Sequence, residues 1–252
     1  MDLRCKMTQY EILMKDPMVS KHIPHTKWYD RKTLMNMMDL YSTIYIKPYN
    51  KSRGNGIIRV KAANKNEYII SFETTYKKVD KRHLALELEQ IMTRPKQYII
   101  QQGIDLATYQ ECSFDMRIVL QKVNNIWRVT LTSAKVANSQ DAIVTNVAKG
   151  AKDYLLHDIL QQYDQKQNSM TIFREIIDFA HQIASILGHK LPLKITGIDI
   201  GIDKHGNLWF IESNALPACK QCKLVNDKLS IKKYEDANRL IGNRSRNKRS
   251  KK

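Results

Sequence analysis

Apolar side chains repeat every three or four residues in three stretches of the chain, which is the spacing of one face of an α-helix. The stretches are residues 31–41, 80–92 and 170–187. Ser169 is placed to cap the third helix at its start, and Gly188 is placed to end it. We therefore predict three helices, each packing one face against a core.

The segments between these helices have the short apolar runs or the alternation of β-strands. The predicted strands are residues 43–47, 57–60, 97–102, 114–121, 126–137, 195–202 and 207–214. Asn124 and Asn125 form a tight turn between two of them. Strands and helices alternate without an internal repeat, so the sequence predicts an α+β fold.

Charge is the most unusual property of the composition, because the 252 residues carry a formal net charge of +17. Residues 242–252 contribute six basic groups and no acid, so residues 226–252 are predicted to be a basic, disordered tail. Such a tail attracts polyanions without specificity, and no specific nucleic-acid partner is expected. The chain has neither an apolar run long enough to span a membrane nor a secretory signal at its start, which favours a cytoplasmic protein.

A glycine-rich segment follows the predicted strand 43–47. Lys47 ends that strand before Pro48, and residues 50–56 have the sequence NKSRGNG. A loop of this kind offers backbone N–H groups and nearby cations to an anion, as a nucleotide phosphate requires. An ordinary hairpin turn explains the same residues, so this segment alone does not decide between the two readings.

The predicted strand 114–121 carries polar residues on one face. Asp115 and Arg117 share that face, and Lys135 lies on the partner strand. The face either lines a binding site or is simply solvated.

The strongest chemical pattern is a hairpin of residues 195–214. Asp199 interrupts a buried run of isoleucine and glycine, and pairing across the turn brings it close to Glu212, with Asn214 on the same side. Two carboxylates and an amide oxygen are ligands that suit Mg²⁺ rather than Zn²⁺. The alternative is an acidic hairpin that faces solvent.

Seven segments in this order resemble the ATP-grasp superfamily: YIKP, SRGNGI, YIIQQGIDL, FDMR, IVTN, GIDIGID and LWFIESNALP. They are most similar to its endospore coat-associated, YheC/YheD-type branch. The similarity extends from residues 22–26 to about Pro217. It implies an α+β ATP-grasp fold in which two subdomains grip ATP between them, with Mg²⁺ on its phosphates. The implied organisation is a short lead over residues 1–25, with the pre-ATP domain short or absent, an ATP-grasp domain over 26–225 and the tail. Its first subdomain would cover about 26–100 and its second about 101–225.

The resemblance also implies roles for individual residues. Lys47 would contact the nucleotide phosphates, and Asn146 would hold phosphate or substrate. Arg117 and Lys135 would stabilise the charge on the phosphoryl group in transfer. The implied lid residues are Ser52, Arg53, Gly54, Asn55 and Gly56; the implied hinge residues beside adenine are Gln101, Gln102 and Ile104; the implied Mg²⁺ ligands are Asp199, Glu212 and Asn214.

By resemblance, the reaction is an ATP-dependent ligation in which a carboxylate takes the γ-phosphoryl group and an amine then displaces phosphate. The carboxylate and amine substrates are unknown. A second hypothesis is a nucleotide-binding structural protein of the spore surface with little or no turnover, partnered by spore-coat components. The third is a nucleic-acid-binding protein driven by charge, which the lack of aromatic residues in residues 242–252 disfavours.

Overall fold

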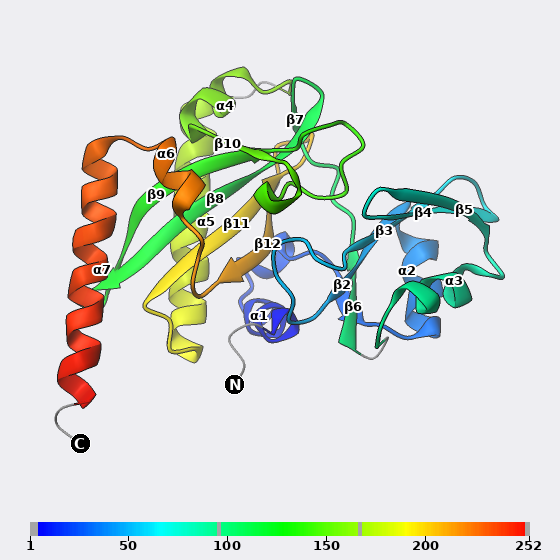
Figure 1. Cartoon of the computed structure of the whole chain (residues 1–252), viewed down its shortest axis with the longest axis horizontal. Coiled ribbons are helices and arrows are strands. Elements are labelled where there is room, and N and C mark those ends of the chain that lie inside the picture. Colours follow the sequence, from blue (N-terminus) through cyan, green and yellow to red (C-terminus); the bar gives the residue numbers. More distant parts are fainter. Residues whose placement is uncertain (1–4, 95–96, 166–167, 250–252) are drawn as a thin grey trace.

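The computed structural model describes residues 5–94, 97–165 and 168–249, with side chains up to residue 242. Two sheets lie side by side and form separate subdomains (Figure 1). Every strand pair within the described residues is antiparallel. The first sheet contains, in spatial order, β1 (Thr26–Trp28), β6 (Tyr98–Gln102), β2 (Thr43–Pro48), β3 (Ile58–Ala62), β4 (Glu67–Phe72) and β5 (Thr75–Asp80).

Two helices cover one face of this first sheet. They are α2 (Arg31–Leu40) and α3 (Leu84–Ile91), and Asp30 caps α2 by accepting a 2.7 Å hydrogen bond from the Thr33 N–H. Leu34 and Leu88 are fully buried in the core of this subdomain. The amphipathic spacing predicted for both helices is therefore explained by packing on one sheet face.

The second sheet is built around a long hairpin. Its main path is β10 (Lys152–Tyr154), β9 (Ile126–Val136), β8 (Cys112–Val123), β11 (Ile195–Ile202) and β12 (Leu208–Asn214), and β7 (Thr108–Tyr109) pairs with β8. Asn124 and Asn125 have φ angles of 52° and 64° at the turn between β8 and β9. This left-handed pair is typical of a tight hairpin turn.

Helices α4 (Leu156–Gln162) and α5 (Ser169–Lys190) pack on one face of the second sheet (Figure 1). Two details of α5 differ from prediction. Its cap is Asn168, which accepts from the Thr171 N–H at 3.0 Å, rather than Ser169. The helix also continues past Gly188 to Lys190. Gly188 is explained by packing instead, because a Cβ there would lie 2.7 Å from the Trp127 ring.

The segment before the first sheet belongs to the second subdomain. Helix α1 (Lys6–Leu13) and the short 3₁₀ turn η1 (Ser20–His22) place Tyr10, Leu13 and Val19 in the same buried cluster as α5 and β11. The expected lead over residues 1–25 is thus, from Cys5 onward, part of a core. The first sheet is inserted between α1 and the rest of that core.

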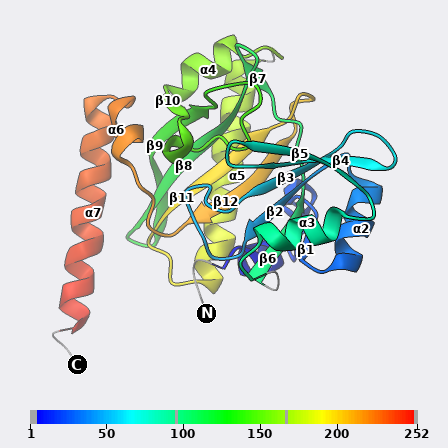
Figure 2. The same cartoon turned by 45° about the vertical axis from the view of Figure 1, so that its right-hand side comes forward.

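The C-terminal segment was predicted to be disordered, and this is wrong for residues 228–249, which form helix α7 (Lys228–Arg249). With α6 (Lys220–Leu224), α7 lies against the other face of the second sheet (Figures 1 and 2). Tyr234 packs there with the two buried thiols Cys219 and Cys222. Residues 250–252 lie outside the described residues. None of the helices in the described ranges has the length and apolarity needed to cross a lipid bilayer.

Candidate active site

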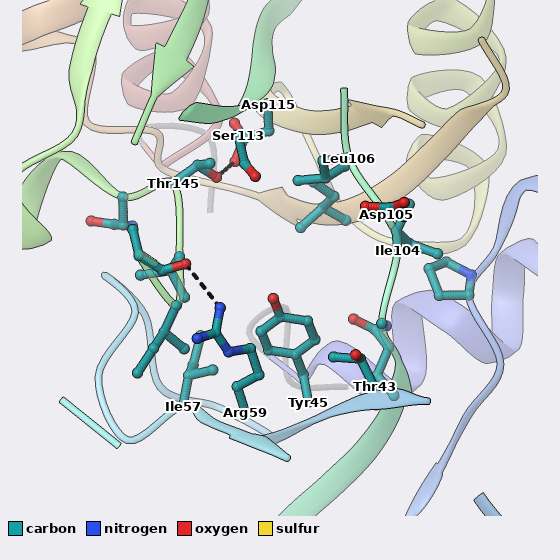
Figure 3. A pocket seen from close by; sticks show the side chains of 18 of the residues that line it. Thr43, Tyr45, Ile57, Arg59, Ile104, Asp105, Leu106, Ser113, Asp115 and Thr145 are labelled. Atoms are coloured by element: carbon teal, nitrogen blue, oxygen red, sulfur yellow. Dashed lines mark hydrogen bonds between the residues drawn. The ribbon is translucent and has the colours of Figure 1, made fainter. Parts of the chain in front are cut away.

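A cavity of about 630 Å³, here called the cleft, opens between the two sheets. One wall comes from β2 and β3, and the opposite wall comes from β8, β9, β11 and β12. The chain passes from one wall to the other through Ile104, Asp105 and Leu106, which line the cleft at that crossing (Figure 3). A site of this size between two layers can enclose a nucleotide-sized ligand.

The second sheet presents four charged side chains on one face, here called the buried charge row: Asp115, Arg117, Lys135 and Asp199. The register of β8 with β9 and β11 sets Asp115 opposite Lys135 and Arg117 opposite Asp199. Lys135 Nζ lies 2.6 Å from Asp115 Oδ1 and 3.2 Å from Asp199 Oδ2. Arg117 donates from Nε and Nη2 to the two oxygens of Asp199, both at 2.6 Å.

Burial and pairing act in opposite directions on these groups. Burial would raise the pKa of Asp199, but Arg117 and Lys135 outweigh it and hold that pKa below the usual value. For Asp115 burial prevails, so its pKa is raised despite Lys135. Burial would lower the pKa of Lys135, but the attraction of Asp115 and Asp199 outweighs burial, so this pKa is raised above its usual value. Arg117 and Lys135 therefore stay cationic in a buried environment, where their charges are weakly screened. Lys135 lines the cleft together with Asp115 and Asp199, whereas Arg117 is paired with Asp199 and is not among the lining residues.

The predicted metal ligands lie together on neighbouring strands. Asp199 and Glu212 are direct partners in the register of β11 and β12, and the Asn214 amide donates to Glu212 Oε1 at 3.1 Å. Asp199 and Glu212 line the cleft, yet Asp199 is engaged by Arg117 and Lys135. Among the described residues no group of three or more His, Cys, Asp or Glu side chains is arranged to hold a metal ion. The donor set of two carboxylates and one amide suits Mg²⁺, and the ligation stays a prediction.

Lys47 reaches the cleft from the opposite sheet. Its Nζ donates to Gln101 Oε1 at 2.6 Å, and the Gln101 amide donates in turn to Thr26 Oγ1 at 2.9 Å. Burial lowers the pKa of Lys47 to about 8. Gln101 was predicted to lie beside adenine, but in this structure its side chain is hydrogen-bonded to Lys47 and orients it.

The other predicted hinge residues also line the cleft. Gln102 Oε1 accepts from the His25 N–H at 3.2 Å, and Gly103 donates its N–H to the Thr43 carbonyl at 2.9 Å. A Cβ on Gly103 would lie 2.8 Å from that carbonyl oxygen, which excludes any other residue without a backbone shift.

The predicted lid residues form the turn between β2 and β3, here called the lid loop (residues 52–56). Arg53, Gly54 and Gly56 have φ angles of 62°, 70° and 73°, a left-handed backbone that glycine adopts without strain. Gly54 lines the cleft, whereas Ser52, Arg53 and Asn55 are exposed.

Asn146 lines the cleft, in the loop that follows β9. Its side-chain oxygen accepts from the Ala148 N–H at 2.9 Å and so caps the 3₁₀ turn η3 (Val147–Lys149). This loop reaches the lid loop, since a Cβ on Gly54 would lie 3.2 Å from Val144 and 3.6 Å from Asn146. In this structure Asn146 therefore shapes the loop that faces the lid.

Several residues of the cleft were not predicted as site residues. Arg59 donates to the Ala142 and Asp141 carbonyls at 3.4 and 3.3 Å and so joins the two walls (Figure 3). Thr145 donates to Asp115. The alternation of side chains along the strand was enough to place Asp115 on the polar face. The hydrogen bond from Thr145 could not be predicted, because Thr145 lies in a loop 30 positions away in the sequence.

The family model of YheC/D-like ATP-grasp proteins matches residues 2–238. The endospore coat-associated protein YheD of Bacillus subtilis (strain 168) is 24% identical over 220 residues, which cover 84% of this chain and 48% of YheD. This chain therefore spans about half the length of that relative.

Solved structures of ligases share the fold at low sequence identity. The VanG D-Ala:D-Ser ligase from Enterococcus faecalis superposes with a TM-score of 0.59 at 14% identity, covering 95% of this chain and 61% of VanG. The ATP-grasp ligase PsnB, complexed with a phosphomimetic variant of its minimal precursor, Mg and ADP, gives 0.54 at 15% identity, covering 95% and 58%. The predicted α+β ATP-grasp fold is thereby confirmed.

Proposed function

Because the chain belongs to the YheC/D-like ATP-grasp family, we propose that it binds ATP with Mg²⁺ in the cleft and acts as an ATP-dependent carboxylate–amine ligase. In this proposal a carboxylate oxygen attacks the γ-phosphorus and ADP leaves. An amine then attacks the carbonyl carbon of the acylphosphate, loses a proton, and phosphate leaves. Both substrates are unknown.

The observation that carries this proposal is that Lys135, with Asp115 and Asp199 of the buried charge row, lines the cleft whose opposite sheet contributes Lys47. Phosphoryl transfer requires little covalent chemistry from a protein, and its rate depends on positioning and on stabilising charge. Fixed cations in a dry wall supply that stabilisation without reorganising during the reaction. Arg117 and Lys135 already have their orientation set by Asp115 and Asp199.

Each remaining group has a role within the same proposal. Lys47 binds a phosphate as a point charge, oriented by Gln101. Asp199, Glu212 and Asn214 would hold Mg²⁺, which neutralises phosphate charge when it is bound. The lid loop and the loop of Asn146 exclude water from the phosphates, and the hinge around Ile104 faces the base.

A second candidate is a nucleotide-binding protein of the spore coat that turns over little or no ATP. The observation that favours it is the 24% identity to an endospore coat-associated protein. Association with the spore coat is part of this second proposal.

Two measurements on the full chain separate the candidates. Calorimetry with MgATP measures nucleotide binding, and phosphate release is followed while pools of amino acids and peptides are added as carboxylates and amines. A ligase binds MgATP and releases phosphate only when both substrates are present. Binding without release in any pool supports the second candidate, and no MgATP binding contradicts both.

A further inference from the structure

Helix α1 contributes a lysine to the edge of the site. Lys6 is only 8% exposed, and its ammonium lies 3.6 Å from Glu212 Oε2. The same ammonium donates to the backbone carbonyl of Lys51, the residue that precedes the lid loop. The Lys6 backbone N–H also donates to the Tyr49 carbonyl at 2.9 Å. One residue thus contacts both a predicted metal ligand and the stem of the lid.

The position of Lys6 is fixed by the rest of α1. The Gln9 amide donates to the Ser213 carbonyl at 2.8 Å, and the Ser213 N–H donates to Gln9 Oε1 at 3.0 Å. The Tyr10 hydroxyl donates to the Ile211 carbonyl at 2.7 Å. These bonds satisfy backbone groups of β12, which is the edge strand of its sheet and carries Glu212. These bonds therefore fix the position of α1 along β12, and with it the position of Lys6 beside Glu212.

A small recess beside the cleft shows which side of Glu212 Lys6 occupies. Lys6, Ser52 and Asn55 line this recess, and Lys47 and Glu212 line both it and the cleft. Lys6 therefore approaches Glu212 from the lid side. The positive charge of Lys6 in that position repels any second cation that binds to Glu212.

We propose that Lys6 is a positioning residue that ties Glu212 to the stem of the lid loop and competes with a divalent cation for Glu212. The competition rests on the proposed function, because it requires a metal at Glu212. The tie to the lid does not, because both of its contacts are made by residues of this chain alone.

The tie is tested by limited trypsin digestion of the full, nucleotide-free chain. Trypsin cleaves after Lys51 and Arg53, so the rate of cleavage there reports how firmly the lid stem is held. We expect Lys6→Met and Lys6→Gln to be cleaved about 3- to 10-fold faster at these sites. Lys15→Met, a change at an exposed lysine just after α1, should be cleaved at the wild-type rate. Equal rates for Lys6→Met and wild type would overturn the tie.

The competition is tested by Mn²⁺ titration of the same nucleotide-free proteins, followed by electron paramagnetic resonance. Lys6→Met should bind Mn²⁺ roughly 3- to 10-fold more tightly, because a repelling charge is removed. Lys6→Arg, which keeps the charge, should resemble wild type. Damage to the site would weaken Mn²⁺ binding instead, so equal or weaker binding by Lys6→Met would overturn the competition. Absence of MgATP binding in wild type contradicts the proposed function, while the trypsin rates still decide the role of Lys6.

Discussion

Arg117 and Asp199 face each other across β8 and β11 and form a two-point ion pair, with both N–O distances at 2.6 Å. Their side chains are 13% and 5% exposed, so the pair is almost dry. A buried pair of this kind is costly to break, because the remaining partner keeps its charge without compensation.

The first prediction concerns the stability of this pair. Arg117→Met should lower the free energy of unfolding by about 3–5 kcal/mol, because Asp199 is left with Lys135 alone. Asp199→Leu combined with Arg117→Met should cost less than the sum of the single changes. Urea denaturation followed by circular dichroism measures both, and strictly additive losses would contradict the coupling.

The second prediction concerns nucleotide affinity. Lys47→Ala should weaken ATP binding about 10-fold or more, since it removes a fixed cation from a partly desolvated phosphate site. The control is Lys65→Ala, at an exposed position in the turn between β3 and β4. Isothermal titration with MgATP measures both variants. Equal affinities for Lys47→Ala and Lys65→Ala would show that Lys47 does not bind the nucleotide.

The third prediction is a pH dependence of stability. Burial lowers the pKa of Lys47 from 10.5 to about 8, so the folded chain binds fewer protons than the unfolded chain between these values. The destabilisation caused by burying this ammonium is fully present below pH 8 and disappears as pH rises towards 10.5. The free energy of unfolding of wild type should therefore rise from pH 8 to 10 relative to that of Lys47→Met. A difference that stays constant with pH would contradict the lowered pKa.

The fourth prediction concerns the metal ligands. Glu212→Ala should retain the fold but lose the Mg²⁺ dependence of ATP binding, because the carboxylate that pairs with Asp199 in the hairpin is removed. A thermal-shift titration of ATP with and without Mg²⁺ tests this. Glu175→Ala, at an exposed position of α5, is the control. If the Mg²⁺-dependent shift persists in Glu212→Ala, the ligand assignment is wrong.

The fifth prediction concerns the backbone of the lid loop. Gly56→Val should destabilise the chain by about 1–2 kcal/mol, because φ is +73° and the added Cβ would meet Pro48 at 3.0 Å. Gly242→Ala in α7 has open space around it and should be neutral or stabilising by up to about 1 kcal/mol. Thermal melts of both variants give the comparison, and equal destabilisation would show that the backbone of the lid loop does not require glycine at position 56.

Local periodicity explains which features could be predicted. Asp115 and Arg117 share a face because strand side chains alternate, whatever the strand later packs against. The pairing of Asp199 with Glu212 follows from a short hairpin whose register is set by its turn. Predictions of this kind depend only on neighbours in the sequence.

The features that were missed depend on distant partners. Gln9 and Ser213 are 204 positions apart, and nothing near Lys6 marks it as a neighbour of Glu212. The expectation of a disordered C-terminal segment relied on charge, but Lys and Arg are good helix formers. Apolar contacts of Tyr234 then hold the first turns of α7 against the sheet.

The insertion of the first sheet between α1 and β12 also has a consequence during synthesis. Gln9 leaves the ribosome 204 residues before Ser213, which at about 5–20 residues per second is roughly 10–40 s. The first sheet has all its strands by Gln102 and can fold in that interval, whereas α1 must wait without its partner strand. Until α5 and β12 emerge, the apolar face of Tyr10 and Leu13 stays uncovered, which is the kind of surface that chaperones of nascent chains shield.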